Sequence, residues 1–119
     1  MADLPLEVQR RLDRLSQEFR SNLPSRLKEI DQLYEQAVRE GEEPLRELRG
    51  VVHRIAGSAA TFGLGELNSL ARDLEAHVER DLSEETQRPT EGTGEAVKAL
   101  VQSWQPVPQQ EPVTTEVID

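Results

Sequence analysis

The apolar residues of this chain recur three and four positions apart, and this spacing constrains the fold more than any other feature. It is clearest between Leu45 and Gly63, where six residues follow it: Leu45, Leu48, Val52, Ile55, Ala59 and Phe62. Such spacing places apolar side chains on one face of a helix, which neighbouring elements must cover. A strand would alternate apolar and polar residues, and we find no such segment. The sequence therefore predicts an all-α fold.

The segment before Leu45 repeats the same spacing from Val8 to Ala37, but Pro24 interrupts it. An internal proline removes one helical hydrogen bond and clashes with the preceding turn. We therefore expect either two helices, near residues 5–20 and 22–40, or a single kinked helix. Our preferred prediction is a short extra helix at the N-terminus.

Glycines and prolines mark the remaining boundaries. Pro44 fits the first turn of a helix that ends near Gly63, and the next helix starts near Gly65. The polar segment 81–94 contains one proline and two glycines, so we expect a loop there and a last short helix from Glu95. Short connections make consecutive helices antiparallel neighbours. The prediction is an antiparallel four-helix bundle with a short extra N-terminal helix.

The composition changes after residue 105. Residues 1–105 carry the helical pattern and suffice for one domain. Residues 106–119 contain three prolines, are acidic and show no apolar periodicity, which is typical of an extended linker. Because the linker runs into the β-prone pair Val117 and Ile118, we expect it to lead to a further domain, such as a receiver.

Charge and composition exclude several classes of function. The net charge is −9, and the chain has only four aromatic residues, which disfavours nucleic-acid binding. It has no cysteine, which excludes disulfides and thiolate metal sites and fits a reducing cytoplasm. No apolar run is long enough to span a membrane, and the first residues do not resemble a signal peptide. We expect a cytoplasmic domain without membrane contact.

His53 stands apart from the apolar face of its helix. It follows Val52, so its side chain is rotated by about 100° from that face and should point to solvent. The residues three positions before it and three, four and seven positions after it are all small: Gly50, Ala56, Gly57 and Ala60. Each glycine inside a helix costs about 1 kcal/mol relative to alanine. The bare surface therefore indicates a need for access, so that another protein can bring a reactive group to the imidazole.

The run from His53 to Gly63, followed by Glu66-Leu67 and by a second helix with Ala71 and Leu74-Glu75, resembles the histidine-containing phosphotransfer (HPt) domains of bacterial two-component phosphorelays. It is similar also to the N-terminal phosphotransfer domain of chemotaxis histidine kinases. The resemblance implies a four-helix bundle that carries a phosphoryl group on His53 and exchanges it with the aspartate of a response-regulator receiver domain. Imidazole is a suitable nucleophile for this step.

The resemblance also implies a phosphocarrier rather than an enzyme. The sequence has no glycine-rich phosphate loop and no acidic metal cluster beside His53. We therefore expect no cofactor on this domain, with Mg²⁺ supplied by the partner receiver, and no activity toward ATP unless the domain belongs to a larger signalling enzyme.

Positive charge near His53 has to come from arginine. Many HPt domains have a lysine three residues after the histidine, and this chain has Ala56 there. Arg49 and Arg46 project on nearly the same face as His53 and are candidates to hold phosphoryl oxygens or to dock the acidic rim of a receiver. Arg54 is a second docking candidate. Alternatively, Arg46 and Arg49 form only a solvated face paired with nearby acids.

Two other interpretations remain open. The chain fits the first domain of a chemotaxis-type histidine kinase, in which His53 is phosphorylated by a catalytic domain, and it fits a plain helical interaction module without covalent chemistry.

The second histidine, His77, has no ring of small residues and is interpreted as an ordinary side chain. Because the bundle closes its core without a partner, we expect a monomeric domain.

Overall fold

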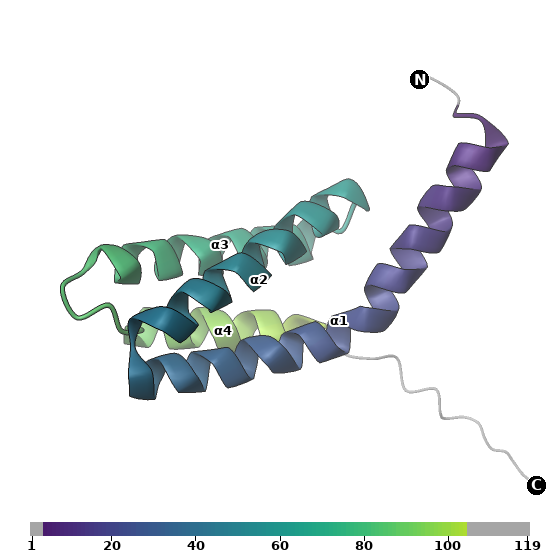
Figure 1. The fold of residues 1–119 in the computed structure, drawn as a ribbon. Helices are drawn as coiled ribbons and strands as arrows, with labels where there is room; N and C mark the ends of the chain where they lie inside the picture. Colours follow the sequence, from purple (N-terminus) through teal and green to yellow (C-terminus); the bar gives the residue numbers. More distant parts are fainter. Residues whose placement is uncertain (1–3, 105–119) are drawn as a thin grey trace, which may run out of the picture.

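The computed structural model describes residues 4–104, so the expected linker 106–119 lies outside the described residues. Four helices make up this part: α1 (Leu6–Glu40), α2 (Glu42–Thr61), α3 (Gly65–Ser83) and α4 (Glu91–Ser103) (Figure 1). Residues 4–104 contain no strand, and the predicted all-α fold is confirmed. Within the same residues, no helix is both long and apolar enough to cross a membrane.

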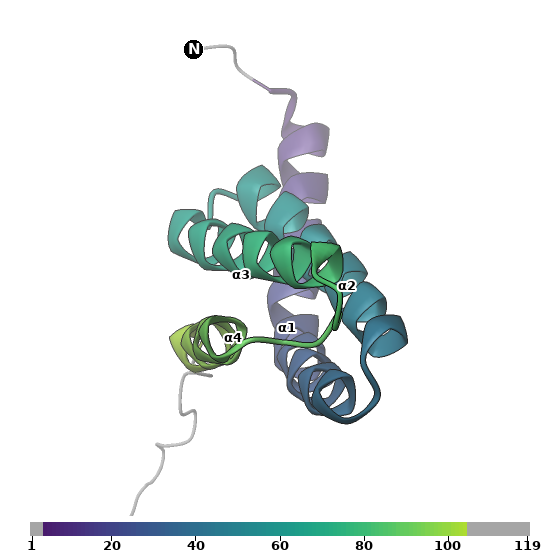
Figure 2. The same ribbon diagram turned by 90° about the vertical axis from the view of Figure 1, so that its left-hand side faces the viewer.

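The helices form an antiparallel bundle around one core. Each helix packs against two others: α1 against α2 and α4, and α3 against α2 and α4 (Figure 2). The largest fully buried apolar side chains come from all four helices: Leu23, Ile30, Leu45, Leu48, Val52, Leu74, Val78, Val97 and Leu100. The predicted antiparallel four-helix bundle is therefore confirmed.

Helix α1 is a single element of 35 residues with Pro24 inside it. The separate N-terminal helix that we preferred is therefore wrong, and the alternative of one kinked helix is correct. Figure 1 shows α1 changing direction between a first part that projects from the bundle and a second part that packs in it. A proline bends a helix because it lacks one hydrogen bond and pushes the preceding turn away, yet the helix can continue beyond it.

The projecting part of α1, residues 6–22, is called the arm below. The sequence pattern places Val8, Leu12 and Leu15 on the apolar face, but these side chains remain 41%, 37% and 44% exposed. Phe19, near the base of the arm, is half-buried, and its ring centroid lies 5.7 Å from that of Phe62. The arm thus has the apolar stripe of a packed helix, while most of that stripe faces solvent.

The connection between α3 and α4 is shorter than we predicted. The expected loop 81–94 is wrong at both ends, since α3 continues to Ser83 and α4 begins at Glu91. Thr90 caps α4 by accepting a hydrogen bond from the backbone N–H of Thr93. Gly94 lies inside this helix. A larger residue would not fit there, because a Cβ atom at this position would stand 2.5 Å from the hydroxyl of Tyr34 on α1. Close packing, rather than a turn, explains this glycine.

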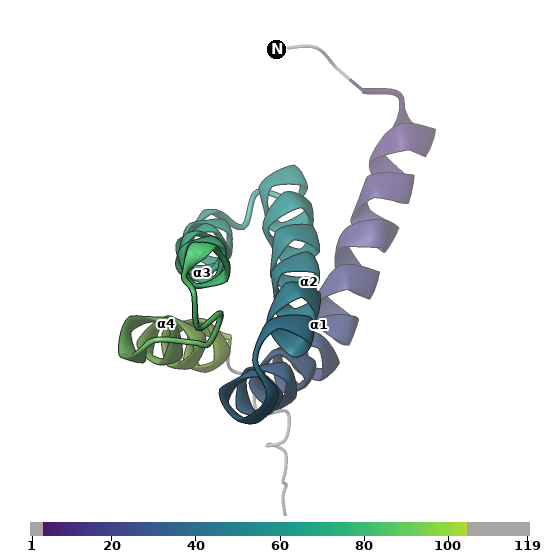
Figure 3. The same ribbon diagram turned by 60° about the vertical axis from the view of Figure 1, so that its left-hand side comes forward.

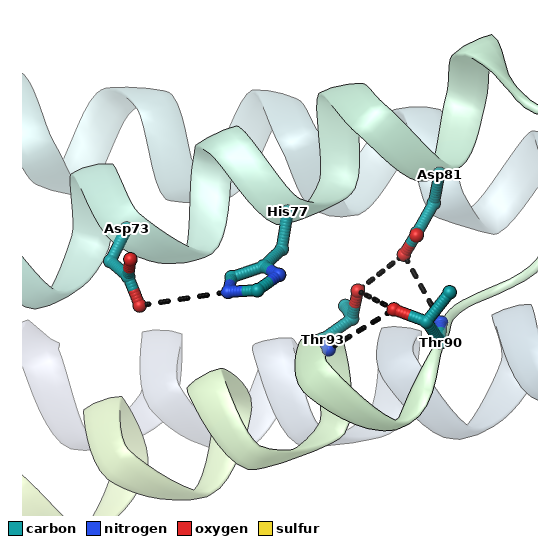
Figure 4. Close-up of polar contacts among 5 residues, drawn as sticks. All are labelled: Asp73, His77, Asp81, Thr90 and Thr93. Carbon is teal, nitrogen blue, oxygen red and sulfur yellow. Dashed lines mark hydrogen bonds and ion pairs between the residues drawn. The ribbon is translucent and has the colours of Figure 1, made fainter.

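A buried polar cluster joins the end of α3 to the start of α4 (Figure 4). The carboxylate of Asp81, 1% exposed, accepts hydrogen bonds from the hydroxyl of Thr93 and from the backbone N–H of Thr90. His77 lies on the same side of α3, with its Nε2 atom 3.9 Å from the carboxylate of Asp73 one turn away. The surroundings of His77 agree with its interpretation as an ordinary side chain.

Candidate functional site

Two glycines set the ends of the helix that carries His53. Gly41, with φ 95°, forms the one-residue link between α1 and α2, and Gly63, with φ 73°, begins the turn into α3. Both values lie in the region that glycine tolerates best. In the turn that begins at Gly63, the backbone N–H of Leu64 donates a hydrogen bond to the carbonyl of Ala59 at 2.8 Å. Helix α2 is therefore held between α1 and α3, with His53 near its middle.

His53 lies on the solvent face of α2, as its position after Val52 predicts. Its side chain is 72% exposed, whereas Val52 is completely buried. The Nδ1 atom of the ring lies 2.7 Å from Oε2 of Glu75 on α3, and the Glu75 side chain is only 16% exposed. An ionised carboxylate only accepts hydrogen bonds, so Nδ1 carries the hydrogen in this contact. In the neutral ring, Nε2 is then the nitrogen with a free lone pair.

Glu75 is the residue that the sequence analysis missed. It appeared there only as part of the resemblance, with no contact to His53 assigned to it. A signal was nevertheless present, because His53 and Glu75 each lie eleven residues from Leu64 in the turn between α2 and α3. In an antiparallel helix pair, residues at equal distances from the turn lie at the same level. The expectation that only small residues surround the imidazole is therefore incomplete.

The four small residues around His53 do not share one environment. Gly57 and Ala60 face solvent, and a Cβ atom added to Gly57 would meet no atom within 4 Å. Gly50 is half-buried. Ala56 is only 3% exposed, so the prediction that it forms part of the accessible surface is wrong. Helix α3 covers it, and the side-chain amide of Asn68 donates to the Ala56 carbonyl at 2.8 Å.

The arginines separate into two groups. A shallow depression beside His53 is lined by residues of α2 and α3: Arg49, Gly50, His53, Arg54, Glu75 and Glu79. The guanidinium of Arg54 lies over Gly50, where a Cβ atom would stand in ordinary van der Waals contact with its Nη1 atom at 3.6 Å. Arg46 is not among these lining residues, and its Nε atom instead pairs with Glu42 at 2.7 Å on an exposed surface. The structure thus places Arg49 and Arg54 beside the histidine and gives Arg46 another partner.

A second depression lies on the other side of His53, toward the end of α2. Its lining residues are His53, Arg54, Gly57, Ser58, Thr61 and Phe62. Phe62 was predicted to close the buried face of the helix, but it is only half-buried, since α2 ends at Thr61 and the ring packs beside Phe19 of the arm. His53 is therefore open to a partner from both sides.

The described residues provide a nucleophilic nitrogen, a carboxylate that orients it, and two guanidinium groups nearby. Among residues 4–104, we find no group of three or more His, Cys, Asp or Glu side chains placed to hold a metal ion. The arrangement is suited to receiving an electrophilic, negatively charged group on a single ring nitrogen.

Comparison with known proteins agrees with this chemistry. The family model described as Hpt domain matches residues 14–105, which is most of the chain. Searches of curated proteins and of solved structures gave no significant match. Domains of the matched family act in histidine phosphotransfer in phosphorelays, as phosphocarriers. The resemblance seen in the sequence is confirmed, and the chain belongs to the Hpt domain family.

Proposed function

We propose that His53 accepts a phosphoryl group and exchanges it with the aspartate of a response-regulator receiver domain. The observation that carries this proposal is the contact between Nδ1 of His53 and Glu75 at 2.7 Å, on an imidazole that is 72% exposed. A half-buried carboxylate fixes one ring nitrogen, and the other nitrogen remains available to a large partner. Membership in the Hpt family supports the same chemistry.

The transfer needs no general base on this domain. The lone pair of Nε2 attacks the phosphorus of the receiver's aspartyl phosphate, the N–P bond forms, and the P–O bond to the aspartate breaks. The aspartate carboxylate leaves, and the hydrogen on Nδ1 stays where it is. The ring therefore gains positive charge during the step, and the carboxylate of Glu75 stabilises this charge from 2.7 Å. The reverse reaction returns the phosphoryl group to the receiver.

Arg49 and Arg54 are the residues that we propose to face the phosphoryl oxygens or the acidic rim of the receiver. Both line the depression that contains His53 and Glu75. Guanidinium groups form strong, charge-assisted hydrogen bonds to phosphoryl oxygens. They would take the part that a lysine three residues after the histidine plays in other HPt domains. Mg²⁺ bound to the receiver would neutralise further charge on the transferred group.

The kinase-domain interpretation uses the same site with a different donor. In a chemotaxis-type kinase, a catalytic domain would phosphorylate His53 before the receiver takes the group. The interaction-module interpretation removes the covalent step altogether. These alternatives differ in the phosphoryl donor and in whether His53 is modified, so one labelling experiment separates all three.

The test is phosphoryl transfer to the 119-residue chain from a phosphorylated receiver and, in parallel, from a histidine kinase catalytic domain with ATP. We expect an acid-labile, alkali-stable phosphoryl group on the natural sequence and none on His53→Gln, because the amide offers no nucleophilic nitrogen. Label from receivers supports the relay carrier, and label only from the kinase domain supports the kinase interpretation. Absence of label from every donor would overturn the proposal and leave the interaction module.

A further inference from the structure

The arm carries most of the exposed large apolar side chains of the described residues. Of the six, Leu4 lies just before the arm and four lie in it: Leu6, Val8, Leu12 and Leu15. The sixth is Val38, near the end of α1. Contiguous apolar surface of this kind is unfavourable in water and marks a site of association.

The order of residues along the arm matches a two-stranded helical pair. Val8, Leu12, Leu15 and Phe19 follow one another at spacings of four, three and four, the seam of a coiled coil. Figure 3 shows the arm apart from α3 and α4, with only α2 beside it, and Val8, Leu12 and Leu15 remain exposed, so a second helix can reach the seam. Phe19 closes the seam where the arm meets the bundle.

Charged residues beside the seam indicate the orientation of the second helix. Arg11 precedes Leu12 and Glu18 precedes Phe19, so both lie on the same flank of the seam, seven residues apart. When two arms pair antiparallel about a point between Leu12 and Leu15, Arg11 of each copy lies opposite Glu18 of the other. In a parallel pair Arg11 faces Ser16 of the other copy, with no charge to meet it. Opposite charges beside the seam favour the antiparallel arrangement.

We propose that the arm is an interface between two copies of this chain, which pair antiparallel about a two-fold axis. The same surface of each copy forms the interface, so each copy contributes both Arg11 and Glu18. A two-fold contact of this kind joins two chains and does not continue into a filament. The seam is short, so the dimer is weak and forms at micromolar to millimolar concentrations. It is independent of the proposed phosphoryl chemistry and differs from the monomeric domain that the sequence led us to expect.

Sedimentation velocity of the 119-residue chain, without any phosphoryl donor, tests the proposal. We expect the average mass to rise toward twice the monomer value as the concentration increases. Leu12→Glu should abolish this rise, because it buries a charge in the seam. Val38→Glu is the matched control, since Val38 is 46% exposed on the same helix but outside the arm, and it should leave the rise unchanged. A natural chain that stays monomeric at every concentration would overturn the proposal.

A charge exchange tests the orientation. Arg11→Glu and Glu18→Arg should each weaken the dimer by about fivefold, because two attractive contacts become repulsive. The double variant restores both contacts and should recover the affinity of the natural chain. Failure of the double variant to recover it would contradict the antiparallel pair. If the chain is always monomeric and Leu12→Glu instead weakens receiver binding, the apolar stripe of the arm binds the receiver, and the proposal of an interface between two copies is wrong.

Discussion

Helix α2 and the arm of α1 both present a surface to solvent, but they do so in opposite ways. On α2 the exposed face carries His53 with two arginines, Arg49 and Arg54, on one side and small residues such as Gly57 and Ala60 on the other, while the opposite face is buried between α1 and α3. The arm exposes large apolar side chains, among them Leu12 and Leu15. Both segments have the same three-and-four spacing of apolar residues. The spacing therefore identifies a helix and its apolar face, but it does not determine whether another element covers that face.

The difference has a functional consequence. The imidazole of His53 is accessible because Gly57 and Ala60 beside it are small, and it is held by Glu75 of the neighbouring helix. That is a rigid site for chemistry. The surface of the arm is accessible because nothing in the described chain packs on it, which suits association. Three sets of variants test this contrast.

The largest expected effect is on stability. Leu48→Ala on the buried face of α2 should lower the free energy of unfolding by about 2–5 kcal/mol, because it leaves a cavity in a fully packed core. Leu12→Ala in the arm should lower it by less than about 1 kcal/mol, because Leu12 is already 37% exposed. Urea unfolding at submicromolar concentration, below the range in which the proposed dimer forms, measures both. Equal losses for the two variants would show that the arm is packed in solution.

The second largest expected effect is on the rate of phosphoryl transfer to His53. Glu75→Ala should slow transfer to His53 by roughly 10–100-fold, by analogy with the loss seen when the partner that orients a metal-bound histidine through its second nitrogen is removed. Glu75→Gln keeps an acceptor for the Nδ1 hydrogen but loses the charge, so its rate should lie between those of the natural chain and Glu75→Ala. Single-turnover transfer from a phosphorylated receiver gives these rates.

Two controls accompany the Glu75 variants. Glu79→Ala removes a carboxylate from the same depression without removing the contact to the ring, and its effect should be smaller. Leu12→Ala should leave the rate unchanged, since the arm is assigned to association rather than chemistry. An equal loss in Glu79→Ala would mean that general negative charge, rather than the contact with Nδ1, assists the reaction.

The smallest expected effect concerns Gly57 on the open face of α2. Gly57→Ala should raise the free energy of unfolding by about 1 kcal/mol, because alanine favours the helix and no atom lies within 4 Å of the added Cβ. Gly57→Gln should also fold well, yet its longer side chain should slow transfer by covering the approach to His53. If Gly57→Gln transfers as fast as the natural chain, the bare surface around His53 is not needed for access.

Local signals in the sequence predicted much of the fold. Gly63 and Pro44 marked the ends of α2 correctly, since a positive φ angle and a proline in the first turn are local requirements. The start of α4 was not predicted, because Gly92 and Gly94 ordinarily indicate a turn. In the structure, the cap at Thr90 and the close approach of Tyr34 to Gly94 make a helix favourable there. That packing depends on residues about sixty positions apart in the chain.

The helical class of the chain, the apolar face of each helical segment and the exposure of His53 could be predicted from the sequence alone, because they follow from the rotation of about 100° per residue along one helix. Three features could be seen only in the packed bundle: Glu75 meets the imidazole, Ala56 is buried beside α3, and the apolar stripe of the arm stays exposed. These three results depend on which helix lies against which face and at what level. A periodic pattern within one helix carries no information on the position of its neighbours.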